Sequence, residues 1–408
     1  MEYNNVIYTL WLSRVKGIGS KTGKKLLEGY KSPQRIYEMA RDGSREHPPG
    51  FFAGVRMEGI WGELVRAVNE IPLEQIFHDV KLWEEQGIHM ICMADEVYPE
   101  RLAKIPDPPM LLYYKGRLPD AHIPSVAIVG ARECSTYGEY VANQLGQALG
   151  LSGIQVISGM ARGIDGISQR AAVENGGASF GVLGSGVDVC YPKSNQALYE
   201  KLCENGGVLS SYPPGTMPTS ANFPPRNRIV SGLSDALVVV EARAKSGTLI
   251  TVDMALEQGK DVFVVPGRIT DRLSDGCNRL LSLGATPFLT PNDFIRQLKE
   301  ICGALWGQIQ FTKEQECREK KGDQKDGRKE ENKERKEKRD VLNIHGMDSR
   351  TDCIRSVLER TPLSTGEILK RLQKKESIEY ADLTVELLKM CTFGLAKQVS
   401  PGQFISVE

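Results

Sequence analysis

Short stretches of almost wholly apolar residues alternate with helix-patterned segments between residues 86 and 305. The apolar stretches are rich in β-branched residues and occupy 125–130, 154–158, 179–184, 208–212, 236–242 and 261–267. Strands that are apolar at nearly every position are typical of parallel sheets, which are covered on both faces. Segments with apolar residues at helical spacing, such as 139–151 and 251–260, lie between them. The alternation predicts an α/β fold with a Rossmann-like, doubly wound parallel sheet.

The region before this sheet predicts helices. Apolar residues recur at helical spacing in 5–15 and 21–30, and the turn Lys16-Gly17-Ile18-Gly19-Ser20 separates the two stretches. Such a turn resembles a helix-hairpin-helix, which holds phosphate through backbone N–H groups, and it is equally compatible with an ordinary interhelical turn. We expect residues 1–85 to form a helical N-terminal region, helix-hairpin-helix-like (SAM-like).

The region after the sheet divides into two parts. Residues 306–348 are expected to form a charged linker, because acids and bases nearly balance there and apolar residues are too few to bury a core. Residues 349–408 predict three helices and then a hairpin across Pro401-Gly402, with a capping box between Ser364 and Glu367. This order of elements predicts a winged-helix-like domain. The sheet domain, 86–305, is expected to carry the anion-binding residues described below.

The composition of the chain limits the classes of function that are compatible with it. The chain has 408 residues with 52 basic and 52 acidic side chains, so any anion binding must come from a local cluster. Nine cysteines without a C-x-x-C pair fit a reducing compartment, and five histidines without helical pairing predict no metal site and no cofactor. The sequence shows no signal peptide and no apolar run of about 18–20 residues, so we expect a cytoplasmic protein without a membrane partner.

Small polar and basic residues follow the predicted strands. They are Gly130, Arg132, Ser135, Ser158, Gly159, Lys193, Arg226, Asn227, Arg228, Ser246 and Gly247. A parallel sheet gathers such turns at one edge, where helix N-termini and arginine forks suit phosphate oxygens. Thr136 and Glu139 are expected to form a capping box at one of these helix starts. Each turn alone is also consistent with a purely structural role, but their number favours an extended polyanion over a single phosphate.

The same residues resemble those of the DNA-processing protein A family (DprA/Smf). The similarity runs from about 95 to 290. Its motifs include Gly130-x-Arg132, Ser158-Gly159, Tyr191-Pro192, Arg226-Asn227-Arg228 and Ser246-Gly247, and the last of them is Pro266-Gly267. The resemblance implies a single-stranded DNA-binding protein that protects incoming DNA in natural transformation, promotes RecA loading and acts as a homodimer. It implies phosphate contacts from Arg132, Lys193, Arg226 and Arg228, with the remaining candidates lining the pocket.

Two positions depart from the family pattern. Gln169 stands where members commonly have a histidine, and Ser211 where they commonly have a glutamate. These losses would affect general acid–base chemistry more than phosphate binding. We therefore expect no enzyme, although a nucleotide-binding sensor or a phosphoribohydrolase-like enzyme using the same pocket remains the alternative, with Glu241 as its best acid.

Overall fold

The structure is a computed structural model. It describes residues 3–43, 57–303, 354, 357–358, 363–372, 383, 387, 390, 396–400 and 403–406. The chain divides into two compact units, Met1–Glu316 and Cys317–Glu408, which are described separately. The predicted charged linker, 306–348, lies outside the described residues. Among the described residues, no helix combines the length and apolar character that crossing a bilayer requires.

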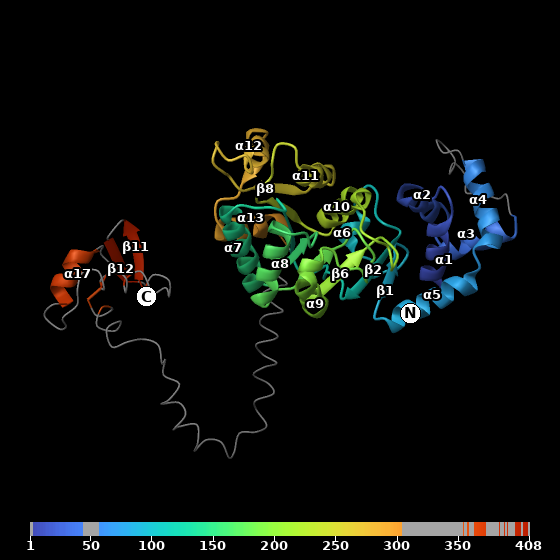
Figure 1. Cartoon of the computed structure of the whole chain (residues 1–408), viewed down its shortest axis with the longest axis horizontal. Coiled ribbons are helices and arrows are strands. Elements are labelled where there is room, and N and C mark those ends of the chain that lie inside the picture. The colour runs from blue at the N-terminus through green and yellow to red at the C-terminus, as the bar shows by residue number, and fades with distance from the viewer. Residues whose placement is uncertain are drawn as a thin grey trace, which may run out of the picture. The chain divides into compact units, whose positions relative to one another are not determined.

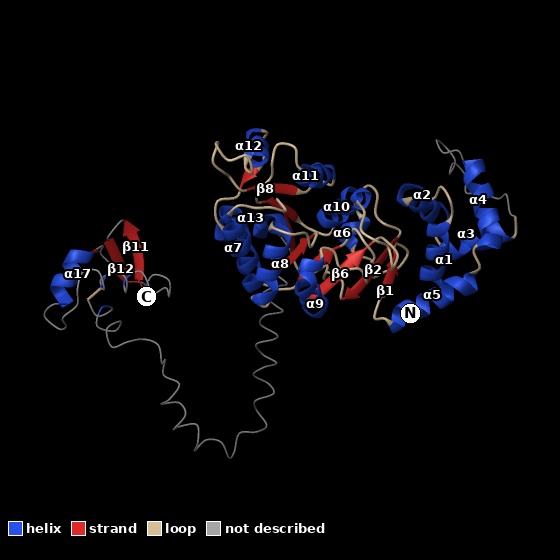
Figure 2. Ribbon diagram, viewed as in Figure 1, coloured by secondary structure: helices blue, strands red, loops and turns tan. Residues whose placement is uncertain are grey.

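The first unit is an α/β domain preceded by helices (Figures 1 and 2). Its helices are α1 (Tyr3–Arg14), α2 (Ser20–Tyr30), α3 (Pro33–Arg41), α4 (Met57–Glu70), α5 (Leu73–Glu85), α6 (Glu100–Ala103), α7 (Thr136–Ser152), α8 (Ile164–Glu174), α9 (Gln196–Asn205), α10 (Phe223–Gly232), α11 (Gly247–Glu257), α12 (Asp275–Ser282) and α13 (Pro291–Cys302), with 3-10 turns η1 (Lys193–Asn195) and η2 (Ser220–Asn222). Its strands are β1 (His89–Cys92), β2 (Leu111–Gly116), β3 (Ser125–Val129), β4 (Gln155–Ser158), β5 (Ser179–Val182), β6 (Gly206–Ser210), β7 (Ala236–Val239), β8 (Asp261–Val264) and β9 (Thr286–Pro287).

The nine strands form one sheet in the order β1-β2-β6-β5-β4-β3-β7-β8-β9. The seven strands from β6 to β9 are parallel, which confirms the predicted α/β fold with a mostly parallel sheet. All six predicted strands are present. Two antiparallel strands, β1 and β2, extend the sheet at one edge, so the sheet is mixed at that edge and not parallel throughout.

Alternate residues of the central strands face two different cores. In β3, Val126 and Ile128 pack with α7, α8 and α13, whereas Ala127 and Val129 pack with α10 and α11. Helices therefore cover both faces of the sheet, as Figure 2 shows. The central strands are apolar at most positions because helices cover both of their faces.

The chain reverses its direction of travel across the sheet between β3 and β7. From β3 it moves through β4 and β5 to β6, and it then returns to the other side of β3 as β7, β8 and β9. Parallel sheets leave a crevice at such a switch point, beyond the carboxyl ends of the two strands. The fold therefore places a binding site beside the turns that follow β3 and β7.

The N-terminal helices are packed firmly onto this sheet domain. Trp11, Leu26 and Tyr30 belong to the same buried cluster as Met110 and Leu198 of the sheet domain. A Cβ atom added to Gly23 of α2 would lie 1.7 Å from the sulfur of Met110, so helix α2 sits directly on that side chain. The helical character predicted for 1–85 agrees with α1 to α5.

The second unit has four described elements: β10 (Leu363–Ser364), α17 (Thr365–Leu372), β11 (Ala396–Ser400) and β12 (Gln403–Ser406). Strands β11 and β12 pair as the predicted hairpin. The predicted capping box is confirmed, because the Glu367 carboxylate accepts from the Ser364 N–H at 2.8 Å and the Glu367 N–H donates to the Ser364 hydroxyl at 3.3 Å. Most of the first and third predicted helices lie outside the described residues.

Candidate nucleic-acid interface

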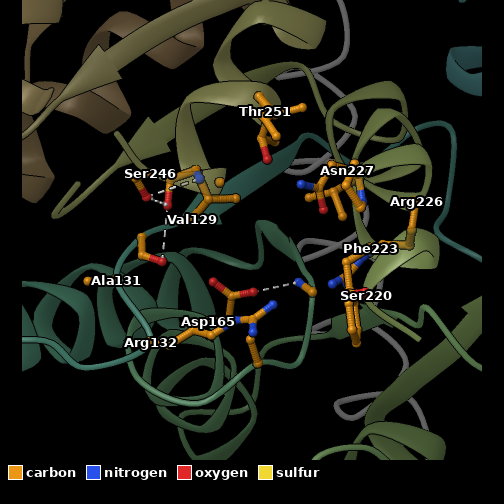
Figure 3. Close-up of a pocket in the computed structure, with 18 of the residues that line it drawn as sticks. Val129, Ala131, Arg132, Asp165, Ser220, Phe223, Arg226, Asn227, Ser246 and Thr251 are labelled. Carbon is orange, nitrogen blue, oxygen red and sulfur yellow. Dashed lines mark hydrogen bonds between the residues drawn. The ribbon is translucent and has the colours of Figure 1, made fainter. Parts of the chain in front are cut away.

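A pocket of about 550 Å³ lies at the switch point of the sheet. Its walls come from the turn after β3, the turn after β4, helix α10 and the start of α11, and Figure 3 shows ten of its residues by name. Three helices, α8, α10 and α11, begin at or beside it. Helix N-termini carry partial positive charge and outward N–H groups, so this arrangement favours an anion.

Arg132 supplies the exposed positive charge of the pocket. It follows β3, and its guanidinium carbon lies 5.3 Å from the ring centre of Phe223, which is a cation–π distance. The Phe223 ring is 5.7 Å from the Tyr191 ring, and Tyr191 is 44% exposed. A guanidinium and two aromatic faces thus lie together at the pocket, where Figure 3 shows Arg132 and Phe223 converging.

Arg226 also lines the pocket, but it is buried. Only 4% of its surface is exposed, and its Nη1 donates to the carbonyl of Val182. Burial lowers the pKa of this arginine to about 10, and the carboxylate of Asp165 opposes that shift. Burial likewise raises the pKa of Asp165, against the effect of Arg226 and of hydrogen bonds such as the 3.1 Å bond from the Gly159 N–H. The charges of Arg226 and Asp165 therefore oppose each other, which reduces the net positive charge that the buried arginine adds to the pocket.

Two buried side-chain amides, those of Gln169 and Asn195, stabilise the turn after β4. The Gln169 side chain accepts from the Met160 N–H at 3.1 Å and donates to the Phe180 carbonyl at 3.0 Å. The Asn195 amide donates to the carbonyls of Met160 and Ala161. Met160 has a φ of 53°, an uncommon conformation for a residue with a side chain, and these bonds hold it there. The Gln169 side chain therefore stabilises the backbone behind the pocket.

Five of the predicted residues line the pocket in addition to the two arginines: Gly130, Gly159, Asn227, Ser246 and Gly247. Ser246 caps α11, accepting from the Thr248 N–H at 3.2 Å. The Thr248 hydroxyl in turn donates to the Gly130 carbonyl at 3.3 Å, which ties the turn after β3 to the start of α11. The two sides of the switch point are thus joined by a hydrogen bond through the pocket wall.

Four predicted residues do not line the pocket. The Ser158 hydroxyl is buried and donates to the Ile128 carbonyl at 2.5 Å. Ser135 caps α7 by accepting from the Gly138 N–H, so the capping box expected from Thr136 and Glu139 is wrong by one residue. Lys193 is exposed in η1, beside Pro192 of a small adjoining pocket.

Arg228, the fourth, points away from the pocket. Its Nη1 lies 2.9 Å from Oδ2 of Asp107, and its Nη2 donates to the Ser20 hydroxyl of α2 at 3.2 Å. The reason is helical geometry, because residues two apart on a helix are separated by about 200° and cannot share a face. Arg226 and Arg228 are therefore on opposite sides of α10.

The acid expected to serve an enzyme is also outside the pocket. Glu241 is 2% exposed, and both of its carboxylate oxygens accept from Ser135, one from the backbone N–H at 2.9 Å and one from the hydroxyl. Within the described residues, no group of three or more histidine, cysteine, aspartate or glutamate side chains could hold a metal ion. Asp165 is the carboxylate that lines the pocket, and it was not among the site residues predicted from the sequence.

The sheet is doubly wound, and helix starts, an exposed arginine and aromatic rings lie at its switch point. This arrangement is typical of the class of proteins that bind the phosphates of nucleotides or nucleic acids. The family model for DNA recombination-mediator protein A matches residues 89–299, and the chain belongs to this family. It is 41% identical over 216 residues to the DNA processing protein DprA of Streptococcus pneumoniae, a match that covers 53% of this chain and 76% of that protein.

Two further comparisons agree with the family assignment. The chain is 34% identical over 306 residues to protein Smf of Synechocystis, covering 74% of each protein. The X-ray structure of DprA from Streptococcus pneumoniae is similar with a TM-score of 0.59 and 33% identity, over 72% of this chain and 97% of that one. The family likeness therefore extends through the sheet domain that holds the pocket.

Proposed function

We propose that the protein binds single-stranded DNA at the switch-point pocket and acts as a recombination mediator that protects incoming DNA and promotes RecA loading. The observation that carries the proposal is the position of Arg132 over Phe223, with Tyr191 beside them. Proteins that bind single strands without strong sequence preference combine cations for the backbone with aromatic faces for the bases. Membership of the recombination-mediator family supports the same function.

We propose that this function is binding without catalysis. Both Glu241 oxygens accept hydrogen bonds from Ser135, and Asp165 accepts from the Gly159 N–H beside Arg226. The acid expected to serve an enzyme and the carboxylate that lines the pocket are therefore both engaged by the fold. We also propose that the protein acts as a homodimer, and that its N-terminal and C-terminal parts are helix-hairpin-helix-like and winged-helix-like. Light scattering of the purified chain across concentration tests the dimer.

The test of DNA binding is fluorescence anisotropy with a labelled oligo-dT, titrated at several salt concentrations. We expect Arg132→Ala to weaken binding and to reduce the slope of log K against log[salt] by about 0.7, the value for one phosphate contact to a single strand. Arg117→Ala is the matched control, because Arg117 is exposed at the opposite edge of the sheet, where its N–H donates to the Gly206 carbonyl. Equal effects of both changes would contradict the proposed site.

A mononucleotide sensor is the second candidate. The pocket volume of about 550 Å³ lies within the range of small-molecule sites, and neither Lys193 nor Arg228 extends it into a longer basic track. A mononucleotide that displaces the labelled oligomer from the pocket at low concentration would favour the sensor. Failure of the mononucleotide to compete would favour DNA, and a RecA filament-assembly assay on coated single strands would then be the next test.

A further inference from the structure

The N-terminal helical region carries a group of exposed lysines that the pocket does not use. Lys16 lies in the turn before α2, and Lys21 and Lys25 lie one helical turn apart on α2 itself. None of the three ammonium groups has a hydrogen-bond or ion-pair partner among the residues that the structure describes. Glu28 is the exposed acid on the same face, so the surface formed by these three lysines, here called the α2 lysine surface, is net positive.

Helix α2 lies near α10, the helix that forms one wall of the pocket (Figure 1). The Ser20 hydroxyl at the start of α2 accepts from Arg228 of α10 at 3.2 Å, and Asn227, the preceding residue of α10, lines the pocket. The pocket and α2 therefore lie on opposite sides of α10, so a strand that reaches both must pass α10, which is about 10–12 Å wide.

The contacts that join α2 to the sheet domain are close-packed and polar. Gly23 rests on Met110 with no room for a Cβ atom, and the Lys24 ammonium donates to the Ile105 carbonyl at 3.5 Å. The ion pair between Arg228 and Asp107 adds a third attachment, and its side chains are 16% and 28% exposed. These contacts fix the lysines at a constant distance from the pocket.

From this arrangement we propose that the α2 lysine surface is a second contact for the single-stranded DNA that enters the pocket. The inference rests on the proposed function of the pocket and extends it. A strand held at the pocket brings its neighbouring phosphates to α2 at high effective concentration, so even weak lysine–phosphate contacts add to the affinity. The second contact engages only strands long enough to cross α10, and the affinity therefore depends on strand length.

The test compares a short and a long oligo-dT, of about 4 and about 16 nucleotides, which span the usual range of single-strand site sizes. The test variant is the triple change Lys16→Ala, Lys21→Ala and Lys25→Ala in the full chain. Each lost phosphate contact is worth about threefold in affinity near 0.2 M salt, so we expect up to about 30-fold weaker binding of the long strand. The salt slope should fall by up to about 2 units for the long strand, and the short strand should bind as in the unchanged protein.

Two control variants make the result specific. The triple change to arginine keeps the charges and should keep the affinity for the long strand. A triple change at exposed lysines elsewhere in the first unit, Lys81, Lys201 and Lys299 to alanine, removes the same charge without touching α2.

The possible outcomes separate the two proposals. Unchanged binding of both strands by the α2 variant would overturn the inference, and so would equal weakening of both strands or an equal effect of the control triple. If the unchanged protein binds neither strand, the pocket function itself fails, and that result is distinct from failure of the second contact.

Discussion

Arg132 and Arg228 both match the phosphate-binding motif by sequence, and the structure predicts that they respond oppositely to mutation. Arg132 is exposed at the pocket, whereas Arg228 is 2.9 Å from Asp107 on the far side of α10. We expect Arg132→Ala to weaken DNA binding without a stability loss. We expect Arg228→Ala to lower stability without a change in the salt slope of binding.

The magnitude follows from the environment of the ion pair. Exposed pairs contribute about 0.2–1 kcal/mol, whereas breaking a fully buried pair costs about 3–5 kcal/mol. The Arg228 and Asp107 side chains are 16% and 28% exposed, which places the pair between these limits. Loss of the hydrogen bond to Ser20 adds about 1 kcal/mol. We therefore expect Arg228→Ala to lower the free energy of unfolding by about 2 kcal/mol, with a coupling of about 1 kcal/mol to Asp107→Ala in a double-mutant cycle.

The assay for stability is urea unfolding followed by tryptophan fluorescence. Trp11, Trp61 and Trp83 all belong to the N-terminal helices, which the Arg228 contacts attach to the sheet domain. Arg132→Ala should shift the free energy of unfolding by no more than about 0.5 kcal/mol, as expected for an exposed side chain. A reduced salt slope for Arg228→Ala with unchanged unfolding would refute this reasoning and would restore the arginine to the DNA contact set.

Three further changes test the pocket itself. Phe223→Leu should weaken oligo-dT binding by about 1–3 kcal/mol with an unchanged salt slope, because it removes a stacking face and no charge. Anisotropy titrations would show a lowered salt slope if stacking were not the cause. Gly159→Ala should lower the free energy of unfolding in urea by about 1–3 kcal/mol. The added Cβ atom would lie 2.4 Å from Nη1 of Arg226 and 2.7 Å from Oδ2 of Asp165. An unchanged free energy of unfolding would mean that these two side chains move freely. Arg226→Met should raise the pKa of Asp165 further, because the arginine charge opposes the effect of burial there. The folded state then binds the Asp165 proton more tightly than the unfolded state, so the variant should lose stability as pH rises above the ordinary value of 3.8, and unfolding at pH 5 and pH 8 should show the larger deficit at pH 8.

The central sheet could be predicted from the sequence because burial on both faces requires runs of apolar residues. Strands such as β3 and β7 are buried at every position, so their residues are almost all apolar and several are β-branched. Strand β1 has an exposed first residue and only four residues in all, and β9 consists of Thr286 and Pro287. Neither element has the fully buried apolar run of the central strands, so both escaped prediction and are defined by their partners in the sheet.

The candidate site was predictable as a region but not residue by residue. The turns after β3, β4 and β7 do meet at one edge, as the parallel arrangement requires. Arg226 and Arg228 were expected in a turn before a helix, but Pro224 and Pro225 are already in the first turn of α10. Proline at a helix start was the available signal, and it would have placed the two arginines on opposite faces. The burial of Arg226 against Asp165 arises from contacts between distant segments, which no local pattern reports.

The charges of the pocket bear on how tightly one site can hold a strand. Because Asp165 opposes the charge of the buried Arg226, the exposed Arg132 and the helix starts provide most of the attraction for phosphate. One or two phosphate contacts correspond to a salt slope of about 0.7–1.4, which is weak binding at physiological ionic strength. Tight retention of a long strand must then come from repeated contacts, such as the α2 lysine surface or a second protomer, whose gain grows with strand length. Under the proposed mediator function, separate weak contacts have the advantage that each can be displaced singly when the strand is released.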